Sequence, residues 1–380
     1  MVSMFLRRPD RRVLVTGSQG FIGKNLVVRL GELRGYEVVS FERGDGLSTL
    51  SAKVALADAV VHLAGENRPK DEADFETGNA ALTRALCDAI QASGRKIPLI
   101  LASSLQAELS NPYGLSKRAA EKAVEELAAS TGNPVVIYRL PGVFGKWCKP
   151  NYNSVVATFC YNTAFKLPLQ INDPSARLWL VYVDDVVSEF LIALGSVSDG
   201  VRWGEVALEY TITLGELAAQ IEAFRMSRTT LVSERVGEGF LRALYATYVS
   251  YLPPSSFAYD LPRHGDERGV FVEMLKTRDS GQFSFFTAHP GVTRGGHYHH
   301  SKTEKFLVIK GSARFCFRHV LTNETCQLLT SGELLQVVET VPGWAHDVTN
   351  IGNDEMIVLL WANEIFDQNK PDTIAMKVTL

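Results

Sequence analysis

Residues 13–23, VLVTGSQGFIG, decide the fold of the first part of the chain. An apolar, β-branched run leads into glycines at positions 17, 20 and 23, and apolar residues at helical spacing follow as far as residue 33. Gly17 permits a tight turn, Gly20 permits the close approach of a pyrophosphate, and Gly23 permits close packing of the helix. Because the N-terminus of such a helix offers free N–H groups and a positive dipole to phosphates, the segment predicts a dinucleotide site.

The same alternation continues outward from this turn through residues 11–250. Strand-like apolar runs, separated by segments of helical spacing, lie at residues 38–41, 59–63, 99–102 and 135–138. Strands that alternate with helices form parallel sheets, and right-handed crossovers place helices on both faces of the sheet. We therefore predict an α/β, Rossmann-type doubly wound parallel sheet for this part of the chain.

The pattern changes near residue 255. A stretch with several proline and glycine residues is followed by short strand-like runs, separated by turn residues, at 283–286, 305–309, 313–317 and 356–361. Several short strands at regular spacing predict an all-β barrel or sandwich. We place the domain boundary so that residues 1–256 form the first domain and residues 257–380 the second.

Composition limits the possible partners and location of the 380-residue chain. Lys plus Arg number 39 and Asp plus Glu number 42, which gives a formal net charge of −3 and disfavours a polybasic nucleic-acid surface. No run of about 18 apolar residues predicts a membrane helix. The five cysteines are odd in number and no pair has CxxC spacing, so we expect neither a disulfide framework nor a cysteine zinc site. We expect a cytoplasmic protein that binds neither nucleic acid nor membranes.

The second predicted strand ends at Glu42 and Arg43. An acidic residue at this position binds the ribose 2′-hydroxyl of NAD, whereas an arginine accepts the 2′-phosphate of NADP. Both residue types are present, so this pair alone leaves the choice between NADH and NADPH open.

Tyr113 and Lys117 lie one helical turn apart at the start of a segment with helical spacing. A nearby ammonium favours the ionised phenol, so we expect Lys117 to lower the pKa of Tyr113 and make it a usable acid or base near neutral pH. Ser103 and Ser104 end the preceding strand, where a hydroxyl can hydrogen-bond a substrate carbonyl. We assign this role to Ser104, with Ser103 as the competing assignment.

At this point residues 11–250 resemble an extended short-chain dehydrogenase/reductase of the nucleotide-sugar type. Besides the glycine turn and the YxxxK pair, the motifs that carry the resemblance are HLAG at 62–65, Asn79, RLPGVFG at 139–145 and YVDDV at 182–186. The resemblance implies that Tyr113 is the catalytic acid/base, that Lys117 tunes it and holds the ribose, and that Ser104 orients the carbonyl. Sugar dehydratases of this family carry Asp-Glu where residues 105–106 here are Leu-Gln, so ketone reduction fits better than 4,6-dehydration.

The resemblance also implies a set of cofactor-binding residues in the glycine turn, at the second strand end, in the HLAG motif and in the YxxxK pair. These residues are Gly17, Gly20, Phe21, Ile22, Gly23, Arg43, Leu63, Ala64, Gly65 and Lys117.

A potential metal site lies in the second domain. His297 and His299 alternate along a predicted strand and therefore face the same side, and Glu304 follows closely. Two imidazoles with a carboxylate suit Zn, Fe, Mn or Ni. The segment from Gly291 to Gly311 resembles the first cupin motif, and residues 342–350 resemble the second, which adds His346 as a ligand. A cupin whose histidines hold only water or core hydrogen bonds is the alternative.

A sugar reductase fused to a cupin resembles the bifunctional capsular-polysaccharide and O-antigen enzymes that make the UDP-N-acetyl-L-fucosamine precursor. The segments 144–155 and 304–308 carry this resemblance most distinctly, and it covers nearly the whole chain. It implies a UDP-2-acetamido-2,6-dideoxy-4-ketohexose substrate, C3 epimerisation in the cupin barrel, and reduction of the C4 ketone with NADPH in the first domain. The product would be UDP-N-acetyl-6-deoxy-L-talosamine. Zinc in the cupin and a homodimer are also implied.

Two rival interpretations remain open. In the first, the chain is a single-activity nucleotide-4-ketosugar reductase whose cupin serves only as a dimerisation module. In the second, the chain is a non-catalytic sensor of nucleotide sugar or redox state. The presence of Ser104, Tyr113 and Lys117 together argues against the sensor.

Overall fold

The computed structural model describes residues 11–68, 71, 75–196, 198–262, 264–266, 269–271, 274–277, 281–364 and 369–378. The chain divides into two compact units, the first made of Met1–Val143 and Trp179–Thr211 and the second of Phe144–Leu178 and Ile212–Leu380. The chain passes from one unit to the other within strands β6 (Gly142–Phe144), β7 (Arg177–Tyr182) and β9 (Glu209–Thr213).

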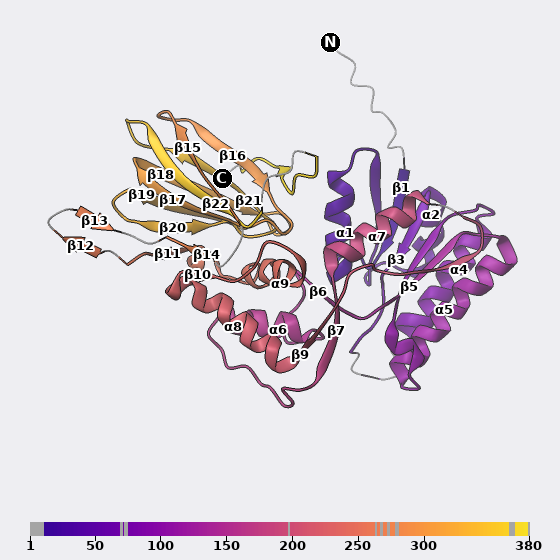
Figure 1. The fold of residues 1–380 in the computed structure, drawn as a ribbon. Coiled ribbons are helices and arrows are strands. Elements are labelled where there is room, and N and C mark those ends of the chain that lie inside the picture. Colours follow the sequence, from indigo (N-terminus) through magenta and orange to yellow (C-terminus); the bar gives the residue numbers. More distant parts are fainter. Residues whose placement is uncertain are drawn as a thin grey trace, which may run out of the picture. The chain divides into compact units, whose positions relative to one another are not determined.

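A parallel sheet forms the centre of the first unit (Figure 1). Its strands in spatial order are β2 (Tyr36–Phe41), β1 (Arg11–Thr16), β3 (Ala59–His62), β4 (Leu99–Ser104), β5 (Val135–Leu140) and β8 (Val201–Gly204). The apolar runs predicted from the sequence lie on these strands to within one residue. From β1 the chain turns to β2 on one side and later to β3 on the other, and a ligand crevice forms at the carboxyl ends of strands where the order reverses in this way.

Helices cover both faces of this sheet. They are α1 (Phe21–Glu32), η1 (Leu47–Thr49), α2 (Leu50–Leu56), the π-helix η2 (Glu76–Ala81), α4 (Leu82–Ala92), the 3₁₀-helix η3 (Leu105–Glu108), α5 (Pro112–Thr131) and α7 (Val183–Gly195). The side chains of β1 alternate between the faces: Leu14 joins a buried cluster with α2, α4 and α5, whereas Val13 and Val15 join a second cluster with α1 and α7. The doubly wound sheet predicted from the sequence is therefore confirmed.

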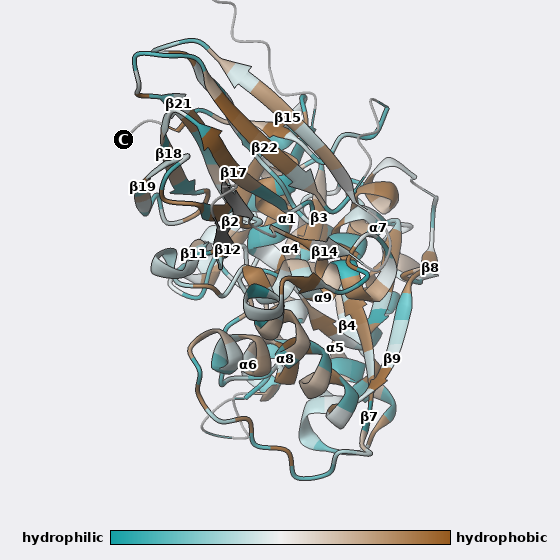
Figure 2. Cartoon of the chain, turned by 60° about the vertical axis from the view of Figure 1, so that its left-hand side comes forward, coloured by the Kyte–Doolittle hydropathy of each residue, from teal (hydrophilic) through white to brown (hydrophobic). Residues whose placement is uncertain are grey.

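Two antiparallel sheets form a barrel in the second unit (Figure 1). One sheet has the order β11 (Ala258–Asp260), β20 (Gln336–Glu339), β17 (Glu304–Lys310), β22 (Met356–Ala362) and β15 (Gln282–Ala288). The other has the order β19 (Thr325–Ser331), β18 (Ser312–His319), β21 (Trp344–Asn350), β16 (Thr293–Tyr298) and β23 (Ile374–Ala375). Figure 2 shows strongly hydrophobic residues along β17 and β22, as expected for strands that line a barrel interior. The predicted cupin-type β domain is confirmed.

Helices and short strands complete the second unit. The helices are α6 (Val155–Ala164), α8 (Leu214–Thr230), α9 (Gly239–Val249) and η4 (Pro254–Ser256). The short strands β10 (Val232–Ser233) and β14 (Lys276–Thr277) pair with each other, as do β12 (His264–Asp266) and β13 (Gly269–Phe271). Phe257, directly before β11, packs edge-on against Phe317 and Trp344 of the barrel.

The compact units and the domains predicted from the sequence divide the chain differently. Helices α6, α8 and α9 precede residue 257 but belong to the same unit as the barrel. A buried ionic cluster explains this grouping, because Arg228 of α8 and Tyr245 of α9 both bond to Glu339 of β20. Compactness follows contacts rather than fold type, so the boundary at 256/257 stays a prediction. Among the described residues, no helix has the length and apolarity needed to span a bilayer.

Candidate functional site

The glycine turn joins β1 to α1. Gly17 has a φ of 70°, and a Cβ atom on it would lie 2.9 Å from the backbone of Ala64. A Cβ atom on Gly23 would lie 2.2 Å from the carbonyl oxygen of Gly17. Both positions therefore require glycine. We expected Gly23 to bring the helix close to the sheet, but the contact that excludes a side chain there is with the turn itself.

The N-terminus of α1 follows this turn. Gly20 occupies the N-cap position and supplies no side-chain hydrogen bond, and Phe21 and Ile22 open the helix. The N–H groups in the first turn of a helix have no intrahelical acceptor. The first turn of α1 can therefore receive a pyrophosphate at the carboxyl end of β1.

Glu42 and Arg43 follow the end of β2 and have different surroundings. The Glu42 carboxylate accepts hydrogen bonds from the Ser18 hydroxyl and, at 3.1 Å, from the Gln19 N–H. The Arg43 side chain pairs with Glu66 but remains 83% exposed. Glu42 is thus tied to the glycine turn, while the Arg43 guanidinium is accessible to an anionic ligand.

A buried histidine holds the end of β3 against the end of β1. His62 Nδ1 lies 2.6 Å from the Thr16 hydroxyl and Nε2 lies 2.8 Å from the Thr83 hydroxyl. The Thr16 hydroxyl oxygen also accepts the N–H groups of Leu63 and Ala64, both at 3.2 Å. Burial lowers the pKa of His62 to about 3, so the ring is neutral. The network fixes the predicted cofactor-binding segment next to the glycine turn, and Thr16 and Thr83 had no distinguishing signal in the sequence.

The predicted acid/base residues come together between β4 and α5. Asn111 caps α5 by accepting the Gly114 N–H at 2.7 Å, and this sets Tyr113 and Lys117 in the first turns of the helix. Ser104 ends β4 and hydrogen-bonds Tyr113. The Lys117 ammonium lies 5.9 Å from the centre of the Tyr113 ring and donates to the Ala102 carbonyl at 3.3 Å.

The direction of the Tyr113 pKa differs from our expectation. Burial raises the pKa of Tyr113, and the hydrogen bond with Ser104 opposes this only in part. Burial also lowers the pKa of Lys117 to about 8, against the attraction of Glu121. The expected lowering of the Tyr113 pKa by Lys117 is therefore wrong, because desolvation of the phenol sets the direction and the opposing contribution comes from Ser104. A phenol with a raised pKa is held protonated at neutral pH.

The two strand-end serines face different partners. The Ser103 hydroxyl donates to Glu121, and Glu121 in turn pairs with Arg139 at 2.7 Å. Successive side chains of a strand point to opposite faces, so Ser104 is left on the side of Tyr113. Glu121 lies one helical turn after Lys117, and that spacing is the signal by which the sequence could have revealed it.

Gly65 of the HLAG motif leaves room for Lys117. A Cβ atom on Gly65 would lie 3.2 Å from Lys117 Nζ and 2.6 Å from Asn79 Oδ1. The Asn79 side chain donates to the Ser116 hydroxyl at 2.9 Å and accepts the Glu66 N–H at 2.9 Å. Asn79 thereby ties the segment after β3 to α5.

The second cluster lies inside the barrel. The potential metal-binding atoms of His297, His299, Glu304 and His346 all lie within 4.8 Å of one another. His297 of β16 lies opposite His346 of β21, and the register of this strand pairing shifts between Gly295 and His297. His299 follows the end of β16, and Glu304 begins β17. The structure thus brings together all four residues predicted as metal ligands.

Burial favours the neutral imidazoles of His297 and His346. It lowers the pKa of His297 to about 3, with the neighbouring His346 and His299 contributing, and it lowers the pKa of His346 as well. Burial alone would raise the pKa of Glu304, but its hydrogen bond with His299 and the proximity of His346 hold the pKa well below the usual value. Neutral imidazoles and an ionised carboxylate are the forms that bind a metal.

The hydrogen bonding of His346 tests whether a metal fits. Neither of its ring nitrogens has a hydrogen-bond partner among the described residues, although the ring is buried. Nε2 faces Glu304 Oε2 at 3.5 Å, which is too long for a good hydrogen bond. A buried imidazole left in this state is costly unless something else binds it. Three imidazoles and one carboxylate fit zinc or a similar divalent metal.

A cavity of about 180 Å³ opens beside this cluster. Aromatic side chains form part of its wall, and polar ones approach the metal ligands: Phe286, Phe306 and Phe315, with Arg294 and Asp347. The barrel can therefore admit a small molecule next to the four potential ligands.

Two family descriptions match the chain. The NAD dependent epimerase/dehydratase family matches residues 13–206, and the polysaccharide biosynthesis C-terminal domain matches residues 264–374. The first covers the unit with the glycine turn and the Ser104–Tyr113–Lys117 set, and the second covers the barrel.

Relatives match along nearly the whole chain. A UDP-2-acetamido-2,6-beta-L-arabino-hexul-4-ose reductase from Pseudomonas aeruginosa is 57% identical over 97% of this chain and 99% of its own. The capsular polysaccharide assembling protein CapF from Staphylococcus aureus is 40% identical, with a TM-score of 0.66 and coverage of 96% of this chain and all of that one. A UDP-glucuronic acid 4-epimerase from Bacillus cereus, in complex with NAD, is 21% identical with a TM-score of 0.50 over 56% of this chain and 83% of its own, a likeness of fold.

Proposed function

The chain belongs to the NAD dependent epimerase/dehydratase family and is an oxidoreductase of nucleotide-sugar metabolism, and we propose that it reduces the C4 ketone of a UDP-2-acetamido-2,6-dideoxy-4-ketohexose with NADPH. The proposal further assigns C3 epimerisation to the barrel before the reduction, which gives UDP-N-acetyl-6-deoxy-L-talosamine. The observation that carries the reductase assignment is the meeting of Ser104, Tyr113 and Lys117 in a chain 57% identical to a 4-ketosugar reductase.

The first unit supplies the groups that a ketone reduction needs. The glycine turn and the first turn of α1 bind the pyrophosphate, and bound NADPH supplies the hydride. Ser104 hydrogen-bonds the C4 oxygen of the sugar, and Tyr113 donates its phenolic proton to that oxygen as the hydride arrives. The raised pKa of Tyr113 suits this role, because the phenol is protonated before the reaction. Lys117 holds the ribose and stabilises the phenolate left behind.

The surroundings of Arg43 support NADPH as the reductant. Its guanidinium is accessible, whereas the carboxylate of Glu42 is already bonded to Ser18 and Gln19. An accessible arginine at this strand end can accept a 2′-phosphate. Replacement of Arg43 by alanine should raise the KM for NADPH and leave the KM for NADH nearly unchanged. Equal effects on both cofactors would contradict the assignment.

The barrel supplies a metal site for the epimerisation. His297, His299, Glu304 and His346 would hold zinc or another divalent metal, which acts as a Lewis acid when bound. The C3 proton of a 4-ketosugar becomes acidic only where the adjacent oxygen is stabilised, and the cavity beside the cluster offers space for the sugar. A homodimer that works in the cytoplasm completes the proposal.

Two measurements test the two activities separately. With a UDP-4-ketosugar, Tyr113→Phe should lower the rate of NADPH oxidation by about 10²–10⁴-fold, because the variant lacks the proton donor. Incorporation of solvent deuterium at C3 without cofactor should persist in that variant and disappear in His346→Ala. NMR of the product identifies the sugar.

The alternative outcomes are distinct. If the wild-type chain oxidises NADPH but incorporates no deuterium at C3, the epimerase assignment fails and the barrel is a non-catalytic module. If Tyr113→Phe retains full activity, the assignment of the proton donor fails.

A further inference from the structure

A loop of four residues connects two of the metal-site residues. Residues 300–303 lie between His299 and Glu304, and the carboxylate of Asp372 binds the backbone of this loop. Asp372 accepts the N–H of His300 at 2.8 Å and the N–H groups of Ser301 and Lys302 at 2.7 Å each. It also accepts the Ser301 hydroxyl at 3.1 Å. One carboxylate from the C-terminal segment thus determines the path of the loop.

The backbone of the same residue contacts the metal-site histidine directly. The carbonyl oxygen of Asp372 accepts a hydrogen bond from His299 Nδ1, 73 residues away in the sequence. Because a carbonyl can only accept, His299 Nδ1 donates its proton to this bond. His299 Nε2 points the other way, toward Glu304 Oε2 at 3.1 Å, inside the cluster. The Asp372 carbonyl therefore orients the ring so that Nε2 is the nitrogen that faces the other potential metal ligands.

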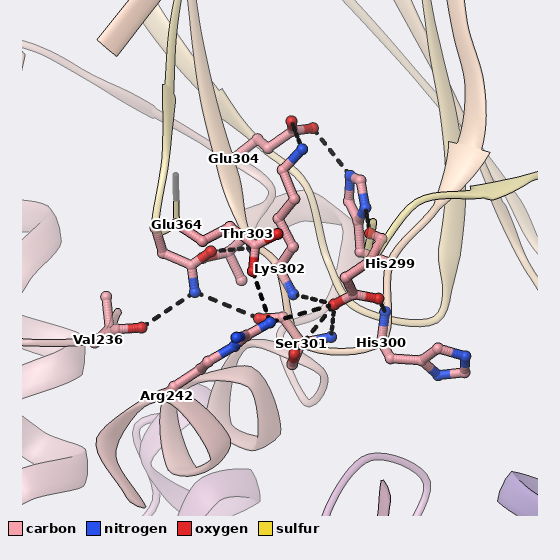
Figure 3. Close-up of polar contacts among 11 residues, drawn as sticks. Val236, Arg242, His299, His300, Ser301, Lys302, Thr303, Glu304 and Glu364 are labelled. Atoms are coloured by element: carbon pink, nitrogen blue, oxygen red, sulfur yellow. Dashed lines mark hydrogen bonds and ion pairs between the residues drawn. The ribbon is translucent and has the colours of Figure 1, made fainter. Parts of the chain in front are cut away.

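Helix α9 reaches the same segment through Arg242 (Figure 3). The guanidinium lies 2.7 Å from Glu364 Oε2 and 3.7 Å from Asp372 Oδ2. Figure 3 shows Arg242 pointing from its helix toward the loop that carries Ser301. Arg242 thus pairs with Glu364 and also lies within ion-pair distance of Asp372.

A second contact ties the loop to the segment before α9. The Asn363 side chain donates to the Val236 carbonyl at 3.1 Å and accepts the Thr303 N–H at 3.0 Å. The Asn363 N–H donates to the Thr303 carbonyl at 3.1 Å. The residues before Glu304 are therefore held from two sides, by Asp372 and by Asn363.

We propose that Asp372 is a positioning residue of the metal centre and that Arg242 fastens it from α9. This inference rests on the proposed metal site and adds a clamp that orients the His299 ring and holds the loop after it. Asp372 is not itself a ligand, because its carboxylate oxygens are bonded to the loop backbone and it lies outside the four-residue cluster found among the described residues. Partners of this kind fix the orientation of a ligating histidine and raise its affinity for the metal.

The first experiment needs no metal. Two-bond ¹H–¹⁵N NMR spectra of the metal-free full-length protein report which ring nitrogen of His299 carries the proton, with His299→Gln identifying the signal. We expect a hydrogen-bonded Nδ1–H in the wild-type protein and in Asp354→Ala, which removes an exposed aspartate of the same barrel. Asp372→Ala keeps the backbone carbonyl but removes the carboxylate that holds this segment to the loop, so we expect the Nδ1–H signal to shift or be lost in that variant. An unchanged His299 signal in Asp372→Ala would overturn the clamp even if the metal site exists.

The second experiment measures the metal. Zinc affinity, determined by competition with a chelator, should fall about 10–100-fold in Asp372→Ala, and the Co²⁺ absorption spectrum should change. Asp372→Asn keeps one acceptor oxygen, so its zinc affinity should lie between those of the wild type and Asp372→Ala. This variant tests the clamp if the alanine variant folds poorly. Arg242→Gln should weaken zinc binding only about twofold to fivefold, since the Arg242 side chain is partly exposed and lies 3.7 Å from the Asp372 carboxylate. The control Arg225→Gln removes an arginine of α8 that pairs with Glu222 on its own helix and should leave zinc affinity unchanged.

The outcomes separate the clamp from the metal site. A wild-type Co²⁺ spectrum and wild-type zinc affinity in Asp372→Ala would overturn the clamp alone. If the wild-type protein and His346→Ala bind zinc equally weakly, the metal site fails, and the role of Asp372 toward a metal fails with it.

Discussion

Two buried histidines, one in each unit, have opposite hydrogen-bonding states. His62 at the end of β3 has a hydroxyl partner on each ring nitrogen, Thr16 on one and Thr83 on the other. His346 in β21 is equally buried, yet neither ring nitrogen has such a partner within the described part of the chain. Burial alone therefore does not mark a ligand. The incomplete hydrogen bonding of His346, among three further potential ligands, does.

The difference follows from what each histidine does. His62 joins two neighbouring parallel strands and keeps the cofactor loop in place, so its partners are part of the fold. His346 lies with His297 and Glu304 inside the barrel, where the metal of the proposed function would bind its ring nitrogen. Each prediction below removes either a buried polar group or one of its hydrogen-bond or ion-pair partners.

The largest effect is expected at Glu339, a buried carboxylate at the centre of a cluster of hydrogen bonds and ion pairs. Its carboxylate bonds to Lys305 at 2.6 Å, to Tyr245 at 2.5 Å and to Arg228. Burial would raise the pKa of Glu339, but Lys305 and Arg228 outweigh it and keep the group ionised. Glu339→Gln leaves two cations without their counter-charge and should lower the free energy of unfolding by roughly 3–5 kcal/mol. Urea denaturation measures this, with the exposed Glu333→Gln as control. A loss below about 1 kcal/mol would show that water, rather than Glu339, compensates the cations.

At His346, by contrast, the readout is metal affinity. His346→Ala removes one of four ligands and should weaken zinc binding by more than about 100-fold, since even outer partners of a ligand change affinity 10–100-fold. Stability is not the readout here, because the substitution also removes ring packing against Phe306 and Phe317. His62→Gln is the matched control and should keep the wild-type zinc affinity. Zinc content and chelator competition decide the comparison, and equal affinity in all three proteins would refute it.

Removing a hydrogen-bond partner of His62 should lower the free energy of unfolding. Thr83→Val removes the partner of His62 Nε2 and should lower the free energy of unfolding by about 1–3 kcal/mol. Thr247→Val is a close control, because both threonines are buried and both donate to a carbonyl four residues earlier, at 2.7 Å. Thr247 bonds no imidazole, so its replacement should cost less. Equal losses in the two variants would assign the effect to the helix bond alone.

The smallest effect is a pH dependence. The pKa of His62 is about 3 in the folded chain because of burial, against an ordinary value of 6.5. The unfolded chain therefore binds the proton first, and the stability contributed above pH 6.5 is lost as the pH falls toward 3. Between pH 6.5 and 5.5 the wild type should lose about 1 kcal/mol more than His62→Gln. Parallel pH profiles for the two proteins would mean that His62 titrates normally in the fold.

Much of both sites could be predicted from local sequence. Glycines at 17 and 23 mark the turn because a side chain at either position would collide with backbone. Strand periodicity placed His297 and His299 on one side. Such patterns act over a few residues, so they are readable without the tertiary structure.

The misplaced or missing details all depended on distant contacts. The direction of the Tyr113 pKa was wrong because it follows from burial, which the YxxxK spacing does not report. The contrast between Ser103 and Ser104 needed the position of Glu121 on a packed helix.

By itself, the sequence determined the two fold types and the chemistry of both residue sets, because turn, strand and helix spacings are local properties of the chain. Only the tertiary structure decided which buried polar groups have hydrogen-bond partners. The hydroxyl partners of His62 and the contact of Asp372 with His299 join residues that are 21 to 73 positions apart in the sequence. Such pairs form only when the packed core brings their elements together, and no spacing rule encodes that distance.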